Sequence, residues 1–446
     1  MGKLVLIAPV FLLALVGVTS AAYCHGKPEP RTVGNNNPIQ ADPPKFVRSV
    51  TNGKLYTVGE GDETIQVVHL WGTPTEMGQA QGELMKERAK NMIDRMWEYM
   101  ESQVTDAING TLPDFFQKWF LDDVANVGLE VALDLEVLAT EKYSGAYFLE
   151  EIKGMADAAG IDFKKVLRIH MIGELTKGSC SMFGAWGEAL FPHGTMLPAT
   201  ELLQMRALDW ITEGPLQDFP QVTVYHPDGE GNGHAFANVG WTGWIGSITG
   251  MSEKKMAISE IGVSFPDDSF GAESRFGVPF TYLLRDILQF DNTLDDSINR
   301  IANSARTCDL IFGVGDGKLN AFRGVQYSAS VANFFDDQNL KPTADWHPLI
   351  KDVVYFGMDW LCPGYSEVLA KQLHTLYGNL TAEAAIRAVM PYVQTGSLHI
   401  AVYDLTNDLM FVANARGTGE TGPDNAYDRP FVRLDMKSLF AEQRPS

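Results

Sequence analysis

Three side chains in the middle of the chain could carry out nucleophilic chemistry. Cys180 lies in the sequence Gly-Ser-Cys-Ser-Met, and Arg206 and Asp209 follow it after a connector, three residues apart. A thiol becomes a strong nucleophile when it loses its proton, a nearby cation favours the thiolate, and a carboxylate can hold an ammonium group. We therefore expect Cys180 to become a new N-terminus when the chain is cleaved.

A free α-amine would complete this set without a histidine. Its pKa is about 8, close to that of a thiol, so the amine of Cys180 could accept the thiol proton within one residue. His170 and His234 lie in no recognisable protease signature, and we expect core or surface histidines there. No cysteine pair has the spacing of a zinc or redox motif, so neither a metal nor a cofactor is expected.

The remaining cysteines leave room for one disulfide. With Cys180 free, an oxidising compartment permits any pairing among Cys24, Cys308 and Cys362. A bridge from Cys24 to the C-terminal half would tether the two fragments of a cleaved chain. Cys308 opens an apolar run at 310–312, and we expect it to be a buried thiol.

Length and composition are those of a globular protein with a large core. The 446 residues are 45% hydrophobic and 20% charged, and no flexible linker divides them, which indicates one large domain or two tightly joined ones. The net charge of −21 disfavours nucleic acid and anionic membrane surfaces as partners. A small-molecule or lipid substrate is expected instead.

The first residues resemble a secretory leader. Lys3 precedes an apolar stretch at 4–18 and small residues at 19–22, so we expect a signal peptide over 1–22, cut near Ala21 or Ala22. The stretch is shorter than the roughly 20 residues needed to span a bilayer, so the mature protein should be lysosomal or secreted, without stable membrane insertion. Asn109 and Asn379 then become candidate glycosylation sites, with chance sequons as the alternative.

Helices dominate before Cys180 and strands after it. A strand is expected at 64–70, and the capping sequence Thr73-Pro74-Thr75-Glu76 begins a helix that runs to about 100. Gly160 should close the next helix, 149–159, and Asp162 should cap another. This pattern predicts an α+β fold with antiparallel sheets. Strands are expected at 196–208, 222–226, 234–239, 245–249, 255–261, 309–314, 321–325, 398–405 and 408–413, and helices at 278–290, 294–303, 365–376 and 381–389.

Several segments together resemble the acyl-CoA:6-aminopenicillanic acid acyltransferase and acid ceramidase-like family of N-terminal nucleophile hydrolases. No single motif decides this, but their order and spacing match over most of the mature chain. The segments are 72–78, 150–156, 174–175, 179–181, 206–210, 243–251, 258–260 and 326–328.

The resemblance implies an αββα sandwich and cleavage between Ser179 and Cys180. A largely helical fragment, 23–179, would stay bound to a fragment, 180–446, that carries the sheets. By the same resemblance, Asp209 accepts hydrogen bonds from the new amine, Arg206 lies beside the thiol and substrate, and Glu260 belongs to the site.

Each assignment has an alternative. Arg206 and Asp209 could form a surface ion pair, and a spacing of three on a strand puts them on opposite faces, so a turn must intervene if both serve one site. Glu260 could be a solvated strand residue. Trp210, Trp241 and Trp244 could line an acyl pocket, but packing against the sheets is the expectation we adopt.

The chain departs from the family pattern at the oxyanion position. Acid ceramidase-like members carry an asparagine after a late strand, followed by an arginine. The corresponding stretch here, 353–360, offers Asp359, and no arginine occurs between Arg323 and Arg387. A carboxylate donates only when protonated, and losing one donor costs about 100-fold or more in rate. A protonated Asp359, backbone amides and Asn238 are the candidate donors.

The resemblance implies an amidohydrolase that acts through a Cys180 thioester. Its substrates would be N-acyl lipids such as ceramides or N-acylethanolamines. The alternatives are an acyltransferase of the same family, or a secreted or lysosomal member that has lost activity and serves as a binding protein.

Overall fold

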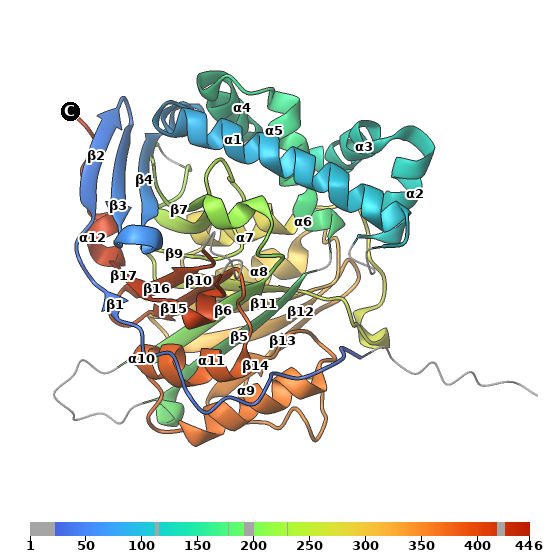
Figure 1. The fold of residues 1–446 in the computed structure, drawn as a ribbon, viewed down its shortest axis with the longest axis vertical. Coiled ribbons are helices and arrows are strands. Elements are labelled where there is room, and N and C mark those ends of the chain that lie inside the picture. Colours follow the sequence, from blue (N-terminus) through green and yellow to red (C-terminus); the bar gives the residue numbers. More distant parts are fainter. Residues whose placement is uncertain (1–22, 112–115, 177, 191–199, 230, 417–423) are drawn as a thin grey trace, which may run out of the picture.

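Two stacked sheets lie between two layers of helices (Figure 1). The computed structural model describes residues 23–111, 116–176, 178–190, 200–229, 231–416 and 424–446. The expected signal peptide, 1–22, and the first four residues of the strand expected at 196–208 lie outside these ranges. The four-layer α+β fold and its mainly antiparallel sheets confirm the expectation from the sequence.

The larger sheet is built from both sides of Cys180. Its order is β13-β12-β11-β10-β9-β8-β7-β4-β3-β2, and all neighbours are antiparallel except β4 and β7. That parallel pair joins the chain before Cys180 to the chain after it. The strands are β2 (Lys45–Val50), β3 (Gly53–Val58), β4 (Ile65–Gly72), β7 (Pro220–Pro227), β8 (Phe236–Trp241), β9 (Gly250–Ser252), β10 (Met256–Gly262), β11 (Leu310–Asp316), β12 (Ala321–Tyr327) and β13 (Ala332–Phe335).

The smaller sheet carries Cys180. Its order is β1-β17-β16-β15-β6-β5-β14, with β1 and β17 parallel and the others antiparallel. The predicted hairpin between the strands expected at 398–405 and 408–413 is confirmed by β15 and β16. The strands are β1 (Ile39–Gln40), β5 (Ser179–Trp186), β6 (Leu202–Asp209), β14 (Val353–Phe356), β15 (His399–Asp404), β16 (Leu409–Asn414) and β17 (Phe431–Asp435).

Helices cover the outer face of each sheet. The larger sheet is covered by α1 (Pro74–Ile108), α2 (Lys118–Val127), α3 (Leu129–Glu141), α4 (Ala146–Ala159), α5 (Phe163–His170), α6 (Ile172–Leu175), α7 (Phe280–Phe290) and α8 (Leu294–Asn303). The smaller sheet is covered by α9 (Pro363–Thr375), α10 (Ala382–Ala384) and α11 (Met390–Val393), while α12 (Met436–Phe440) ends the chain. None of the described helices is long and apolar enough to cross a membrane.

The predicted helix signals hold. Thr73 accepts a hydrogen bond from the Glu76 backbone, and the Glu76 carboxylate accepts one from the Thr73 backbone, which is the capping box that the sequence indicated. Gly160 ends α4 at φ 70°, a left-handed conformation that glycine adopts at little cost. Asp162 caps α5 by accepting from Lys164 N. These ends are local, which is why the sequence specified them.

The strand expected at 245–249 was wrong, because the backbone of this segment makes single hydrogen bonds to several different partners and no continuous strand ladder. Thr249 O accepts from Val239 N of β8, and Ser247 N donates to Thr281 O, both at 2.9 Å. Ile245 N donates to His170 Nε2 at 3.0 Å, and the Asn238 amide donates to Gly246 O at 2.9 Å. Gly243, at φ 82°, turns the chain just before it. The segment is therefore a buried loop, and β9 begins only at Gly250.

The segment 23–179 is largely helical, as expected, but it also carries strands besides the one expected at 64–70. The N-terminal segment contributes β1 to β4, and β2 to β4 form one edge of the larger sheet. β2 was missed because its side chains are mostly exposed at the sheet edge, so it lacks the apolar alternation of a covered strand.

The facing surfaces of the two sheets pack closely. A Cβ atom at Gly184 of β5 would lie 2.2 Å from the Phe322 ring of β12, so only glycine lets that ring enter the smaller sheet. Cys180, Met182 and Phe322 belong to the same buried cluster. The nucleophile candidate therefore lies between the sheets rather than on a surface.

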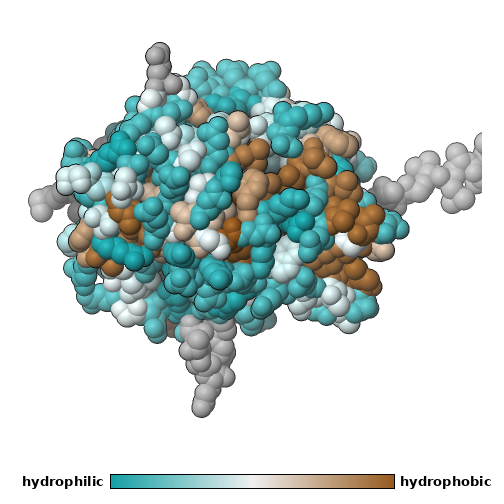
Figure 2. Space-filling model, turned by 90° about the horizontal axis from the view of Figure 1, so that it is seen from above, coloured by the Kyte–Doolittle hydropathy of each residue, from teal (hydrophilic) through white to brown (hydrophobic). Residues whose placement is uncertain are grey.

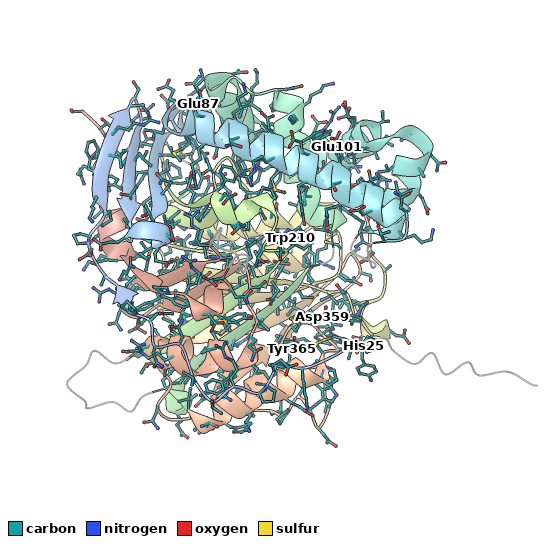
Figure 3. The ribbon with its side chains drawn as sticks, in the orientation of Figure 1. His25, Glu87, Glu101, Trp210, Asp359 and Tyr365 are labelled. Atoms are coloured by element: carbon teal, nitrogen blue, oxygen red, sulfur yellow. A yellow bond between two sulfur atoms is a disulfide. The ribbon has the colours of Figure 1, made fainter. Side chains whose placement is uncertain are left out.

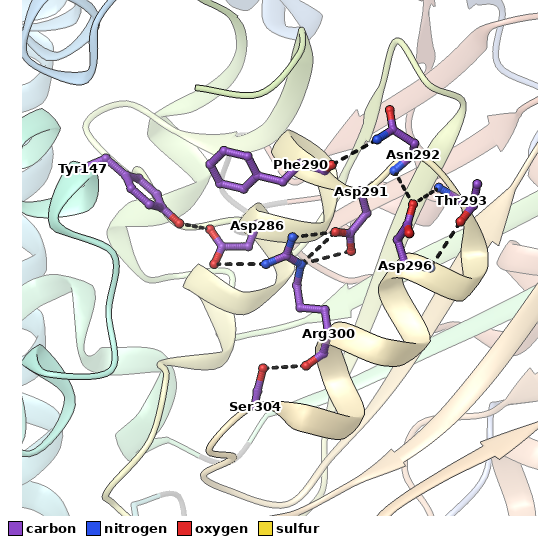
Figure 4. Close-up of polar contacts among 9 residues, drawn as sticks. All are labelled: Tyr147, Asp286, Phe290, Asp291, Asn292, Thr293, Asp296, Arg300 and Ser304. Carbon is purple, nitrogen blue, oxygen red and sulfur yellow. Dashed lines mark hydrogen bonds and ion pairs between the residues drawn. The ribbon is translucent and has the colours of Figure 1, made fainter. Parts of the chain in front are cut away.

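Polar networks join elements on the two sides of Cys180. Arg300 of α8 pairs with Asp291 at 2.6 Å and with Asp286 at 4.0 Å, and Tyr147 of α4 donates to Asp286 (Figure 4). A half-buried cation is thus shared by two carboxylates, and α4 is bound to α7 and α8. This contact would persist if the chain were cut before Cys180.

The outer helical layer also exposes apolar side chains (Figure 2). Seen from above, they gather at the end of the molecule formed by α2, α3 and the end of α1. The exposed members are Ile108, Val127, Val131, Leu135 and Leu138. Asn109 and Asn379, the candidate glycosylation sites, are exposed at the ends of α1 and α9, and their modification stays a prediction.

Candidate active site

Cys180 is the second residue of β5, with β6 on one side and β14 on the other. The strand register pairs Ser179 with Asp209, Cys180 with Leu208 and Met182 with Arg206. Paired residues in an antiparallel sheet point to the same face, so Cys180, Leu208 and Arg206 share the face toward the larger sheet. The Cys180 side chain is 1% exposed.

Arg206 lies between the thiol and a carboxylate from the other sheet. Its Nη2 atom lies 3.4 Å from Cys180 Sγ and 3.0 Å from Glu260 Oε2, and its Nε donates to Glu260 O at 3.3 Å. Both charged side chains are buried, and burial raises the pKa of Glu260 while the Arg206 charge opposes the rise. Glu260 is therefore a buried ion-pair partner and not a solvated strand residue.

The environment keeps the thiol protonated in the intact chain. Burial raises the pKa of Cys180 far above its ordinary value, and Arg206 only partly offsets this. The charges of Glu260 and Asp209 raise the pKa further, while a hydrogen bond with the Asp209 backbone lowers it. A base close to the sulfur is thus required before Cys180 can act as a nucleophile.

Asp209 ends β6 beside Ser179, and no turn separates it from Arg206. Both residues lie in β6, so their side chains point to opposite faces of the smaller sheet, as the spacing of three indicated. Its Oδ1 accepts from Gly396 N and Ser397 N, both at 2.9 Å, while Oδ2 is buried and has no hydrogen-bond partner among the described residues. Desolvation raises the pKa of Asp209 to about 6, with the two backbone donors, the Ser397 hydroxyl and the Arg206 charge opposing the rise. A hydrogen-bond donor beside Asp209 Oδ2 would therefore stabilise this buried oxygen.

A mostly apolar cavity of about 80 Å³ opens beside the thiol. Trp210, Trp241 and Trp244 all line it. The sequence had led us to expect that they only pack against the sheets, so that expectation is corrected. Trp210 lies beneath the helical layer near the centre of the molecule (Figure 3). Apart from Cys180, Glu260, the threonines Thr176 and Thr281 and the tryptophans, the described lining consists of aliphatic residues, one phenylalanine and glycines: Met96, Ile172, Gly173, Gly178, Leu208, Leu216, Ile248, Gly262, Phe280 and Leu310.

No histidine is among the described residues that line the cavity. His170 is a core histidine whose Nδ1 donates to Val166 O and whose Nε2 accepts from Ile245 N. Burial lowers the pKa of His170 to about 4, so it stays neutral. His234 is likewise outside the cavity, and burial lowers its pKa to about 4. Nor do three His, Cys, Asp or Glu side chains come together as metal ligands in the described part of the chain.

The two side chains considered as oxyanion donors are engaged elsewhere. The Asp359 carboxylate accepts backbone hydrogen bonds from Ser264, Phe265 and Trp360, so it is an acceptor and not a donor. The Asn238 amide donates to Gly246 O, and neither residue lines the cavity. The structure thus argues against both candidates and leaves backbone amides as the remaining one.

Two further residues shape the site and escaped the sequence analysis. Met358 accepts the Cys180 N–H on its carbonyl oxygen at 3.1 Å. A Cβ atom at Gly262 would lie 2.8 Å from Gly178 N, so this glycine lets the segment before Cys180 run close to β10. Neither has a reactive side chain, and only the spatial neighbourhood of Cys180 reveals them.

The cysteines divide into one disulfide and two thiols. Cys24 is bonded to Cys362, with a Cα–Cα distance of 4.6 Å, so one of the three open pairings is selected. It is the kind of bridge that would tether the fragments of a cleaved chain. Cys308 is a buried thiol beside Glu174, as expected.

Sequence comparison with known proteins identifies the family of the chain. No family model matches it. It is 34% identical to protein dcd1A of Dictyostelium discoideum over 445 residues, which cover 96% of each chain. It is 36% identical to protein dcd1B of the same organism over 420 residues, which cover 92% of this chain and 81% of that one. The chain belongs to the dcd1 family.

Solved structures resemble this dcd1-family chain only weakly. An N-acylethanolamine-hydrolyzing acid amidase ortholog of Caenorhabditis elegans gives a TM-score of 0.37 at 10% identity, covering 57% of this chain and all of that one. A mutant conjugated bile acid hydrolase from Clostridium perfringens gives 0.29 at 10% identity, covering 58% and 85%. TM-scores below 0.5 do not establish a common fold, so neither likeness serves as evidence of function.

Proposed function

We propose that this dcd1-family protein is an N-terminal nucleophile amidohydrolase that cleaves itself between Ser179 and Cys180. The observation that carries the proposal is the position of Cys180 at the start of β5, with Arg206 3.4 Å from its sulfur and an unpartnered carboxylate oxygen of Asp209 at the neighbouring strand end. Cleavage would turn the Cys180 amide, which has one N–H, into an ammonium group, which has three. Asp209 Oδ2 is an acceptor that such a group would satisfy.

The freed amine would also supply the missing base. It accepts the thiol proton, and the thiolate attacks the carbonyl carbon of an amide substrate. The ammonium then returns that proton to the leaving amine as the carbon–nitrogen bond breaks, which leaves an acyl thioester on Cys180. Water hydrolyses the thioester, and hydrolysis is favoured here over transfer to a second amine.

The cavity supports an apolar acyl group as the part of the substrate next to the sulfur. Its described lining is mostly hydrocarbon and indole, with Glu260 as the charged exception. Together with the acid ceramidase-like segments in the sequence, this favours N-acyl lipids such as ceramides or N-acylethanolamines. Secretion or delivery to lysosomes, glycosylation at Asn109 and Asn379, and retention of fragment 23–179 as partner of 180–446 belong to the same proposal.

One observation favours a second candidate, a protein that binds apolar ligands without turning them over. The described cavity lining contains no asparagine, glutamine, arginine or histidine side chain to stabilise an oxyanion. Such a protein would keep the fold and the cavity, and cleavage before Cys180 could still occur.

Intact-mass analysis followed by an activity panel tests both candidates. The secreted protein should contain a fragment that begins at Cys180, and it should release a fluorophore from N-acyl amides. A chain that keeps the Ser179–Cys180 bond at acid and neutral pH would rule out the autoprocessed enzyme. A cleaved chain that is inactive on the whole panel would favour the binding protein.

A further inference from the structure

The backbone N–H of Cys180 is held by a residue with an unusual conformation. Met358 has φ 74°, in the left-handed region that residues with a Cβ atom rarely adopt. Its carbonyl oxygen accepts the Cys180 N–H at 3.1 Å, and its own N–H donates to Ser181 Oγ at 2.9 Å. Both backbone polar groups of Met358 therefore bond to β5 at the nucleophile.

Asp359, the next residue, donates its backbone N–H to Gly357 O at 2.9 Å, across Met358, and its carboxylate accepts three further hydrogen bonds. Its Oδ1 accepts from Phe265 N at 3.2 Å and from Trp360 N at 2.7 Å, and its Oδ2 accepts from Ser264 N at 2.9 Å. Asp359 is 1% exposed. Because Ser264 and Phe265 lie just beyond the end of β10, the carboxylate joins the loop after β14 to the strand that carries Glu260.

An acceptor-only side chain is needed at this position. Three backbone N–H groups converge on the two carboxylate oxygens, and an asparagine would offer one oxygen and an NH₂ group. The NH₂ group would face the N–H of Ser264 or of Phe265, and one buried donor would lose its acceptor. The aspartate is thus explained by its neighbours, without any contact with a substrate.

The opposite end of β5 has a similar arrangement. Asp352 has φ 59°, its carbonyl oxygen accepts from Trp186 N at 3.0 Å, and its Oδ2 accepts from Glu188 N at 2.8 Å. β14 therefore holds β5 at both ends through a residue of positive φ. Only one of these ends carries the nucleophile, so Asp352 provides a matched control for Asp359.

We propose that Asp359 is a positioning residue that acts through Met358. It holds the Met358 carbonyl oxygen where it receives the Cys180 N–H in the intact chain. After cleavage, the same oxygen receives one N–H of the new ammonium group while Asp209 receives another. The second statement rests on the proposed function; the first does not.

Hydrogen exchange resolved to single amides tests the first statement in a chain that cannot be cleaved. In a Cys180→Ala background, Asp359→Asn should speed exchange of the residue 180 amide about tenfold, and Asp359→Ala should speed it further, because the Met358 carbonyl is released. Asp352→Asn should speed exchange near Trp186 and leave residue 180 unchanged. Unchanged protection at 180 in both Asp359 variants, or equal loss with Asp352→Asn, would overturn the proposal.

The pH dependence of turnover tests the second statement. A hydrogen bond to the ammonium form raises the pKa of an amine, so Asp359→Asn should lower the pKa that governs the acid limb of the kcat profile by about 0.5 to 1 unit. Asp352→Asn should leave this limb in place, and an unchanged limb with Asp359→Asn would contradict the role after cleavage. If the wild-type chain is never cut before Cys180, the proposed function fails, and hydrogen exchange alone decides the role of Asp359.

Discussion

The Nη2 atom of Arg206 lies 3.4 Å from the sulfur of Cys180, and both side chains are almost completely buried. The same nitrogen lies 3.0 Å from Glu260 Oε2. One cation from the smaller sheet therefore links the Cys180 thiol to a carboxylate from the larger sheet. Stability and reactivity of the site are coupled through this guanidinium, and the first prediction separates them.

Arg206→Met should lower kcat/KM by at least about 100-fold, because the thiolate loses its adjacent cation. It should also lower the free energy of unfolding by about 3 to 5 kcal/mol, since Glu260 is left as a buried, unpaired group. Urea unfolding and steady-state kinetics measure the two effects. The double variant Arg206→Met/Glu260→Gln should regain much of the stability but not the activity. Recovered activity in the double variant would show that Arg206 serves only to neutralise Glu260.

Cys180→Ala should abolish both cleavage and turnover, because the sulfur is the proposed nucleophile of each reaction. The protein should remain folded, since alanine fits the space of a thiol that is 1% exposed. Intact mass should then show one chain in place of two fragments. Cys308→Ala, which removes the other buried thiol, is the control and should be cleaved normally. Normal maturation of the Cys180 variant would refute the assignment.

Asp209→Asn should slow turnover by about 100-fold while changing the folded state little. Its Oδ1 can still accept from Gly396 and Ser397, but an NH₂ group replaces the oxygen that is free to receive an ammonium N–H. Thermal unfolding should change by no more than a few degrees. A large loss of stability with unchanged kcat would make Asp209 a structural residue of the loop that precedes β15.

The Cys24–Cys362 disulfide should hold the two fragments of a cleaved chain together. Its half-cystines lie on opposite sides of the Ser179–Cys180 bond, 338 residues apart. Gel electrophoresis of the matured protein should show one band without reductant and two bands with it. Cys24→Ser should give two bands under both conditions. Separate bands from the wild-type protein without reductant would mean that the fragments are held by packing alone.

Glu136→Gln should stabilise the protein in alkaline solution. Burial, helped by the charge of Glu174, raises the pKa of Glu136 to about 8, and its Oε2 lies 3.2 Å from Arg275 Nε. A raised pKa means that the folded state binds the proton more tightly. Protonated Glu136 therefore contributes its full stabilisation of the folded state below pH 4.5, the ordinary pKa of the group. This contribution is lost as the pH rises through about 8.

At pH 8.5, the free energy of unfolding of Glu136→Gln should therefore exceed that of the wild type by about 4 to 5 kcal/mol, and at pH 4 the two should be nearly equal. Glutamine keeps an acceptor for Arg275, so the comparison isolates the charge. Urea unfolding at several pH values measures the difference. Glu383→Gln, which alters an exposed carboxylate, is the control. A constant difference across the pH range would contradict the titration of Glu136.

Local sequence determined much of the helical framework and indicated the candidate site residues. The capping box at Thr73, the Gly160 stop and the cap at Asp162 depend on residues within a few positions, so their patterns can be recognised in the sequence. Cys180, Arg206, Asp209 and Glu260 were chosen for their chemistry and their order along the chain. The structure brings Cys180, Arg206 and Glu260 into contact because β10 of the larger sheet faces β5 and β6 of the smaller one, and it places Asp209 beside Ser179.

Features that depend on contacts between distant parts of the chain could be seen only in the tertiary structure. Cys24 pairs with Cys362, which lies 338 positions away. The loop at 245–249 depends on His170, 75 positions before Ile245, as well as on the nearby Asn238. Asp359 looked like a defective oxyanion donor in the sequence, where its backbone partners near 264 could not be seen. In the folded protein it accepts three N–H groups and holds the residue that receives the Cys180 amide. A side chain's type limits the hydrogen bonds it can make, but only the fold brings its partners within reach.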